Sequence, residues 1–207
     1  MSKILLTIGR SFGSGGSEIA KKVADMLGIS YYDKELIKLA AIKRGINENL
    51  LQNADEKPVN SFLYSIVSHG FPAYTSPIQY NNLVTNDKVF SIQSDIIKNI
   101  AENESAVFVG RCADYILREY PDLINIFVYA DKSSRVKRIA SVNNLSEKEA
   151  LDAIKKTDKE RANYYNFYTN RNWGECTNYD LCISSDIGVE KAAEAIVSYI
   201  KNIKESK

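Results

Sequence analysis

The sequence has few of the residues that mark disulfide scaffolds, zinc sites or membrane spans. It contains three cysteines, none in a Cys-x-x-Cys spacing, and one histidine, which argues against a disulfide framework and a Cys/His zinc site. No apolar stretch approaches the roughly 20 residues of a membrane helix. The 27 basic and 26 acidic residues nearly cancel, so there is no strong positive field for nucleic acid. We expect a cytoplasmic, unexported protein that binds neither nucleic acid nor membrane.

What the sequence does contain is a regular alternation of short apolar runs with longer helix-period segments. This alternation predicts an α/β fold with a parallel sheet. The predicted strands are Ile4–Ile8, Ala106–Val109, Ile124–Tyr129 and Leu181–Ile183. The predicted helices are Glu18–Leu27, Lys34–Lys43, Asp87–Glu102, Ser133–Val142, a long helix behind the capping box Ser146 to Glu149, and Val189–Ile203. Between residues 58 and 86 the period breaks, which predicts an excursion from the sheet.

The most informative segment lies directly after the first predicted strand. Gly9 to Ser17 carries four glycines ahead of a predicted helix. Its backbone N–H groups are suited to form a nest for anionic oxygens at the positive end of the helix dipole, so the loop predicts a bound nucleotide. Against the general phosphate-loop pattern Gly-x4-Gly-Lys-Ser/Thr, only Gly15 and Ser17 match. Gly16 stands at the place of the lysine, and Arg10 at the place of the first glycine.

A second candidate follows another predicted strand. Ligands of parallel α/β sheets bind beyond the carboxyl ends of the strands, and Gly110-Arg111 comes directly after Ala106–Val109. Arg111 therefore projects toward the same crevice as the glycine loop, where a guanidinium can hold two phosphate oxygens at once. The alternative is a surface salt bridge, which the position directly behind a strand disfavours.

A basic segment follows from Asp131 to Arg171, with ten basic and six acidic residues. Arg135 and Arg138 lie three apart and share a helix face. The alternative is a solvated basic face, but in a phosphotransferase such a segment would close over the phosphates and exclude water. Asp158, one turn before Arg161, would orient that arginine or accept hydrogen bonds from a base or ribose; a plain ion pair fits the spacing equally well.

Together these segments resemble the cytidylate kinase-like family, a divergent branch of the P-loop nucleoside monophosphate (NMP) kinases. The matching segments, which span nearly the whole chain in order, are Gly13-Ser14-Gly15-Gly16, Leu27 to Leu36, Val109 to Tyr115, Asp158 to Tyr165, Trp173-Gly174 and Asn178 to Ile183. The resemblance implies an α/β P-loop kinase three-layer sandwich with a five-stranded parallel sheet, an NMP-binding excursion and a helical lid. It implies one domain over 1–207: a core of 1–44, 96–130 and 173–207, an NMP-binding region at about 45–95 and a lid at about 131–172.

The resemblance also implies an activity: transfer of the γ-phosphoryl group of MgATP to CMP or dCMP, with Ser17 helping to hold Mg²⁺. Arg111 resembles the arginine of a Gly-Arg-Asp motif that binds the acceptor phosphate; Cys112 replaces the aspartate, and Asp114 is a candidate substitute. The implied nucleotide-binding residues are Arg10, Gly13, Ser14, Gly15, Gly16 and Ser17. The implied acceptor-binding residues are Asp33, Arg111, Asp114, Asp158 and Arg161, and the implied catalytic residues are Arg111, Arg135, Arg138 and Arg161.

Three questions stay open at the level of sequence. Arg10, Lys21 and Lys22 are all candidates to replace the charge of the missing loop lysine. The alternatives to a cytidylate kinase are a catalytically weak nucleotide-binding sensor or scaffold of the same fold, and a small-molecule kinase with a non-nucleotide acceptor. The latter would need a general base, for which Asp33 or Asp114 is the candidate. The aromatic residues of 58–86 suit an acceptor site or a homo-oligomer contact.

Overall fold

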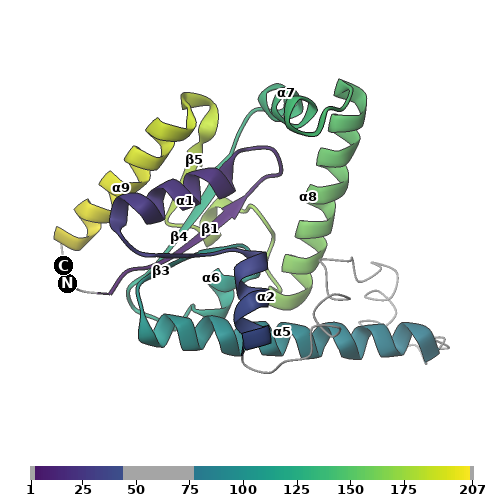
Figure 1. Cartoon of the computed structure of the whole chain (residues 1–207), viewed down its shortest axis with the longest axis vertical. Coiled ribbons are helices and arrows are strands. Elements are labelled where there is room, and N and C mark those ends of the chain that lie inside the picture. The colour runs from purple at the N-terminus through teal and green to yellow at the C-terminus, as the bar shows by residue number, and fades with distance from the viewer. Residues whose placement is uncertain (1–2, 44–76, 206–207) are drawn as a thin grey trace.

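A single parallel sheet forms the centre of the molecule. The computed structural model describes residues 3–43 and 77–205 (Figure 1). Five strands lie in the order β2-β3-β1-β4-β5, and every neighbouring pair is parallel. The strands are β1 (Leu5–Arg10), β2 (Ser30–Tyr32), β3 (Ala106–Val109), β4 (Leu123–Tyr129) and β5 (Leu181–Ser184). All carboxyl ends therefore meet at one edge, with β1 in the middle.

Helices cover both faces of this sheet and make a three-layer sandwich (Figure 1). One face carries α1 (Gly16–Leu27) and α9 (Val189–Glu205); the other carries α2 (Lys34–Lys43), α5 (Pro77–Asn103) and α6 (Ala113–Ile116). The pair α7 (Lys132–Asn143) and α8 (Glu147–Thr169) stands at the end of the sheet where β1 leads into α1. Two short 3-10 helices, η1 (Cys176–Asn178) and η2 (Ser185–Ile187), flank β5. No helix in the described ranges is long and apolar enough to cross a membrane.

The core consists of two apolar layers separated by the sheet. Leu6 and Ile8 of β1 pack toward α1 and α9, whereas Leu5 packs toward α5 and α6. Successive side chains of a strand point to opposite faces, so a strand covered on both sides is apolar at nearly every position. This explains why the strands appear in the sequence as continuous apolar runs rather than as alternating ones.

The predicted α/β class and the five-stranded parallel sheet are confirmed. The predicted Ala106–Val109 strand agrees with β3, and the capping box is present: the Ser146 N–H donates to Glu149 Oε2 at 2.9 Å. The strand β2 was not predicted from periodicity, because its three residues, Ser30–Tyr32, are too few to show a pattern.

The helix α5 differs from its prediction in where it begins. It begins at Pro77, ten residues before the predicted start at Asp87. Proline is well suited to the first turn of a helix, where its missing N–H has no intrahelical partner to lose. The asparagines that follow obscured the helical period. Residues 45–76, which are most of the NMP-binding region predicted at about 45–95, lie outside the described residues.

Candidate active site

The glycine loop joins the central strand to α1 and leaves the start of that helix open. Gly13 and Gly15 have φ values of 82° and 75°, in the left-handed region that favours glycine. The buried Ser14 hydroxyl donates to the Ser11 carbonyl at 2.9 Å and accepts from the Gly16 N–H at 3.3 Å. The N-cap residue of α1 is Gly15, which has no side chain to cap the helix, and the Ser17 side chain in the first turn is exposed. The loop therefore has the form of an anion-binding nest at a helix N-terminus.

Arg111 is the most unusual side chain at this edge of the sheet. It is only 4% exposed, yet its Nε and Nη1 atoms have no hydrogen-bond partner among the described residues. The guanidinium carbon lies 5.9 Å from the centre of the Tyr164 ring. A buried charge without acceptors is costly, and an anionic oxygen ligand removes that cost. The site therefore fits a phosphate group at Arg111.

The backbone that presents Arg111 is strained. Gly110, Arg111 and Cys112 have φ values of 72°, 57° and 56°, so three successive residues adopt the left-handed conformation. This conformation is uncommon for residues other than glycine, and it persists only where the surrounding structure enforces it. The buried side chain of Cys112 packs in the core beneath α5 and holds the turn from below. The strain directs the arginine into the site.

The helices α7 and α8 contact the glycine loop through Asp158. Its Oδ1 atom accepts from the Phe12 N–H at 2.7 Å, and its Oδ2 atom accepts from Arg135 Nη1 at 2.5 Å. Arg135 also donates to the Phe12 carbonyl at 3.2 Å. Beneath these polar contacts Phe12 packs with Ile139 and Ile154 in a small apolar cluster. One carboxylate thus both docks α8 on the loop and orients Arg135.

Two further arginines of this helix pair lie against the loop. Arg138 pairs with Glu18 of α1, and its guanidinium carbon lies 3.0 Å from the place a Cβ would take on Gly15. Arg161 donates to the Arg10 carbonyl at 3.0 Å and lies 5.5 Å from the centre of the Phe12 ring. The predicted residues Arg135, Arg138, Asp158 and Arg161 are therefore brought together around the nest.

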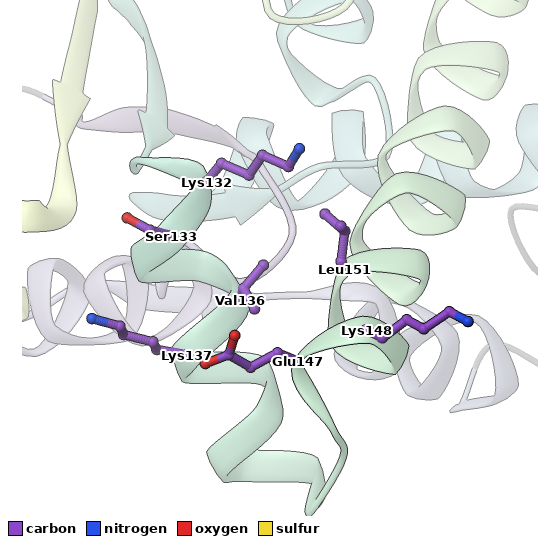
Figure 2. A pocket seen from close by; sticks show the side chains of 7 residues that line it. All are labelled: Lys132, Ser133, Val136, Lys137, Glu147, Lys148 and Leu151. Carbon is purple, nitrogen blue, oxygen red and sulfur yellow. The ribbon is translucent and has the colours of Figure 1, made fainter.

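A separate hollow opens between the first turns of α7 and α8 (Figure 2). Val136 and Leu151 face each other across it, while Lys137 and Lys148 point away to either side. Its remaining lining residues are Lys132, Ser133 and Glu147. None of the arginines around the nest lines it, so it is distinct from the candidate active site.

The two other predicted carboxylates have hydrogen-bond partners of their own. Asp33 Oδ1 accepts from the Glu35 and Leu36 N–H groups at 3.0 Å, which caps α2. Burial, together with the negative charge of Asp33, raises the pKa of Tyr31 to about 12. Asp114 is 8% exposed and accepts from the Tyr165 hydroxyl at 2.6 Å. Burial raises the pKa of Asp114, and the bond from Tyr165 opposes that rise.

Sequence reasoning missed Phe12, which docks α8 on the loop, and Glu18, which pairs with Arg138. Only Phe12 had a signal, because an aromatic residue inside a glycine loop needs a packing partner. Residues 3–43 and 77–205 contain no group of three or more metal-ligating side chains. Mg²⁺ keeps several waters and binds largely through substrate phosphates, so it needs few ligand atoms from a protein. The Ser17 hydroxyl beside the nest is suited to be one of them.

The fold is a parallel α/β sandwich, and the glycine loop at the edge of its sheet has the form of an anion-binding nest surrounded by arginines. The chain belongs to the cytidylate kinase-like family, whose model matches residues 5–187. A cytidylate kinase of Methanothrix thermoacetophila is 25% identical over 184 residues, 88% of each chain. A cytidylate kinase of Methanosarcina barkeri is 25% identical over 182 residues, 87% of each chain. The family resemblance predicted from the sequence is confirmed.

Solved structures share the fold of this chain. A crystal structure of an uncharacterized protein from Eubacterium ventriosum ATCC 27560 is 32% identical, with a TM-score of 0.71 over 96% of this chain and 99% of that one. A gluconokinase from Sinorhizobium meliloti 1021 shares the fold at 12% identity, with a TM-score of 0.56 over 98% of this chain and 94% of that one. Family and fold together support a phosphotransferase.

Asp158→Ala tests how the helix pair is held on the loop. The substitution removes the acceptor of the Phe12 N–H and leaves Arg135 without its carboxylate. A hydrogen bond to a charged group contributes about 1.5–3 kcal/mol, so exchange of the Phe12 amide hydrogen should accelerate about tenfold or more. Amide hydrogen exchange followed by NMR measures this. Asp152→Ala, at an exposed site of α8, is the control, and unchanged exchange in Asp158→Ala would contradict the docking role.

Asp114→Asn tests the buried carboxyl group. Because the pKa of Asp114 is raised in the folded protein above the ordinary 3.8, the folded state holds its proton more tightly than the unfolded state. Its contribution to stability is therefore lost as pH rises from about 3.8 through the raised value. Asparagine keeps an acceptor for Tyr165 but does not ionise. We expect the free energy of unfolding of Asp114→Asn, measured by urea denaturation, to rise relative to that of wild type as the pH increases through that window. A difference independent of pH would refute this.

Proposed function

We propose that the protein transfers the γ-phosphoryl group of ATP to a nucleoside monophosphate, with CMP or dCMP as acceptor. The observation that carries this proposal is the buried guanidinium of Arg111, whose Nε and Nη1 atoms have no partner among the described residues. It stands behind β3, at the same edge of the sheet as the glycine loop. Two anion-binding features at one edge suit a reaction between two phosphate groups. The relatives named cytidylate kinase support the choice of acceptor.

The donor phosphates would bind at the glycine loop. The open N-terminus of α1 and the loop N–H groups supply donors for their oxygens. Ser17 would hold Mg²⁺, which when bound with ATP neutralises charge on the transferred group. Ser14, with its hydroxyl bonded to Ser11 and Gly16, fixes the loop rather than facing a ligand.

The helix pair α7–α8 would act as the lid. Arg135 and Arg138 lie beside the loop on one face of α7, and Arg161 reaches the loop from α8. Positive groups at this place stabilise charge that develops on the phosphoryl oxygens and exclude water. A phosphate acceptor needs no general base, because its attacking oxygen is already anionic. Positioning and charge neutralisation therefore carry the rate.

One feature favours a second candidate, a nucleotide-binding sensor or scaffold with weak catalysis. Gly16 occupies the place of the loop lysine, and loss of that charge would weaken stabilisation of the transition state. A sensor would still be stabilised by ATP, because any ligand that binds the native state raises its stability. ATP binding and ADP formation together therefore separate the two candidates.

A coupled ADP-release assay tests the reaction directly. MgATP is combined with CMP, dCMP, UMP, AMP or GMP, and with no acceptor as the control. We expect turnover to be fastest with CMP or dCMP and to fall to background without an acceptor. If no ADP forms with any of these acceptors and ATP still raises the temperature of unfolding, the result would favour the sensor or a non-nucleotide acceptor instead.

Arg111→Ala tests the acceptor site. Removal of a charge that binds phosphate in a water-poor site should lower kcat/KM for the acceptor roughly tenfold to a thousandfold. Arg118→Ala is the matched control, because Arg118 is exposed and pairs with the neighbouring Glu119. Wild-type kinetics in Arg111→Ala would remove this residue from the mechanism. The Arg118→Ala variant should keep wild-type kinetics.

A further inference from the structure

Gly16 stands at the place of the loop lysine because the structure leaves no room there for a side chain. A Cβ built on Gly16 would lie 2.5 Å from Arg10 Cβ and 3.1 Å from Arg10 Cγ. Such a separation is far below van der Waals contact between carbon atoms. The stem of Arg10 therefore occupies the volume in which a side chain at residue 16 would begin. In this chain, therefore, the Arg10 side chain and a side chain at residue 16 cannot both be accommodated.

The charged end of the Arg10 side chain extends from that point toward β3. Arg10 Nη1 lies 2.4 Å from the place a Cβ would take on Gly110, the residue before Arg111. The Arg10 side chain thus bridges the start of α1 and the end of β3. Its carbonyl oxygen meanwhile accepts from Arg161 of α8. Arg10 accordingly lies between the nest that would hold the donor and the arginine that would hold the acceptor.

The two lysines that compete with Arg10 for this role point elsewhere. Lys22 Nζ forms an ion pair with Glu190 Oε1 of α9 at 2.9 Å, on the face of α1 that packs against α9. Lys21 has an exposed side chain one residue earlier on α1. Neither lies between the loop and β3. The positive charge of Arg10, in contrast, acts on the hydroxyl of Tyr31 in β2 and lowers its pKa against the larger effect of burial.

We propose that Arg10 replaces the loop lysine as the cation on the transferred phosphate, and that Gly16 is the space this replacement requires. The inference rests on the proposed phosphoryl transfer. A guanidinium is always charged and offers parallel N–H groups, so it can hold two phosphate oxygens at once where an ammonium acts as a point charge. The lysine of the general loop pattern and Arg10 of this chain would then reach the same phosphate from different backbone positions. The lysine would reach it from the start of the helix, and Arg10 from the end of β1.

Arg10→Gln is the decisive variant, because glutamine keeps part of the stem that packs on Gly16 and removes the charge. The probes are MgADP and inorganic pyrophosphate, with dissociation constants measured by isothermal titration calorimetry. We expect pyrophosphate to bind at least about tenfold more weakly, the factor expected when one charge-assisted contact is lost. Lys21→Ala and Lys22→Ala are matched controls that remove one charge each. Both should bind pyrophosphate within about twofold of wild type.

A charge swap tests the exclusion between the two positions. Gly16→Lys alone should weaken pyrophosphate binding, because its Cβ collides with Arg10. Arg10→Ala/Gly16→Lys removes the collision and returns a cation to the ordinary place, so it should bind pyrophosphate more tightly than either single variant. Thermal unfolding confirms that each variant is folded. If Arg10→Ala alone does not fold, pyrophosphate binding by Arg10→Gln still tests the role of Arg10. Comparison of the double variant with Gly16→Lys then still tests the exclusion.

The outcomes separate this inference from the proposed function. Tight pyrophosphate binding by wild type and equally tight binding by Arg10→Gln would overturn the role of Arg10 and leave the kinase proposal intact. A double variant no better than Arg10→Ala would overturn the exclusion. Wild type that binds neither pyrophosphate nor MgADP would overturn the proposed function and this inference together. Weakened binding in Arg10→Gln with recovery in the double variant supports the replacement.

Discussion

The structure depends on the concentration of positive charge at one edge of the sheet. Five arginines gather there, namely Arg10, Arg111, Arg135, Arg138 and Arg161. Like charges held close together in a partly buried site repel one another strongly. Asp158 and Glu18 offset part of this repulsion by pairing with Arg135 and Arg138. The Nε and Nη1 atoms of the buried Arg111 have no partner among the described residues, so the site as a whole is complementary to a polyanion.

Sheet topology is what allows these arginines to meet. The central strand β1 lies between β3 and β4, so the glycine loop that follows it has the turn of Gly110 and Arg111 on one side and the start of α7 on the other. The glycine loop, the turn that carries Arg111 and the helix pair thus come from three neighbouring strand ends. A reaction between two phosphate groups requires this adjacency, because the reacting groups must be held in line and close together.

Much of this arrangement could be predicted from the sequence, because it follows from local patterns. Continuous apolar runs indicated the buried strands, and the glycines of the loop and the arginine behind β3 indicated the edge of the sheet at which the five arginines gather. The left-handed conformation of Arg111 and Cys112 could not be predicted, since neither residue type favours it and Cys112 lies in a core cluster built from distant parts of the chain. The proposed choice of Arg10 over Lys21 and Lys22 could not be made from the sequence either. All three are basic residues near the loop, and only their directions in space distinguish them.

The glycine loop also couples the helix pair to the phosphate site. The Phe12 N–H is held by Asp158, so this amide belongs both to the loop and to the contact with α8. The same carboxylate orients Arg135, and Arg161 of α8 holds the carbonyl of Arg10. A phosphate that fixes the conformation of the loop must then favour the docked position of α7 and α8, and docking must favour the binding of phosphate by the same free energy. In the proposed reaction, water exclusion and charge neutralisation would therefore reach completion together, when phosphate is bound and the helix pair is docked.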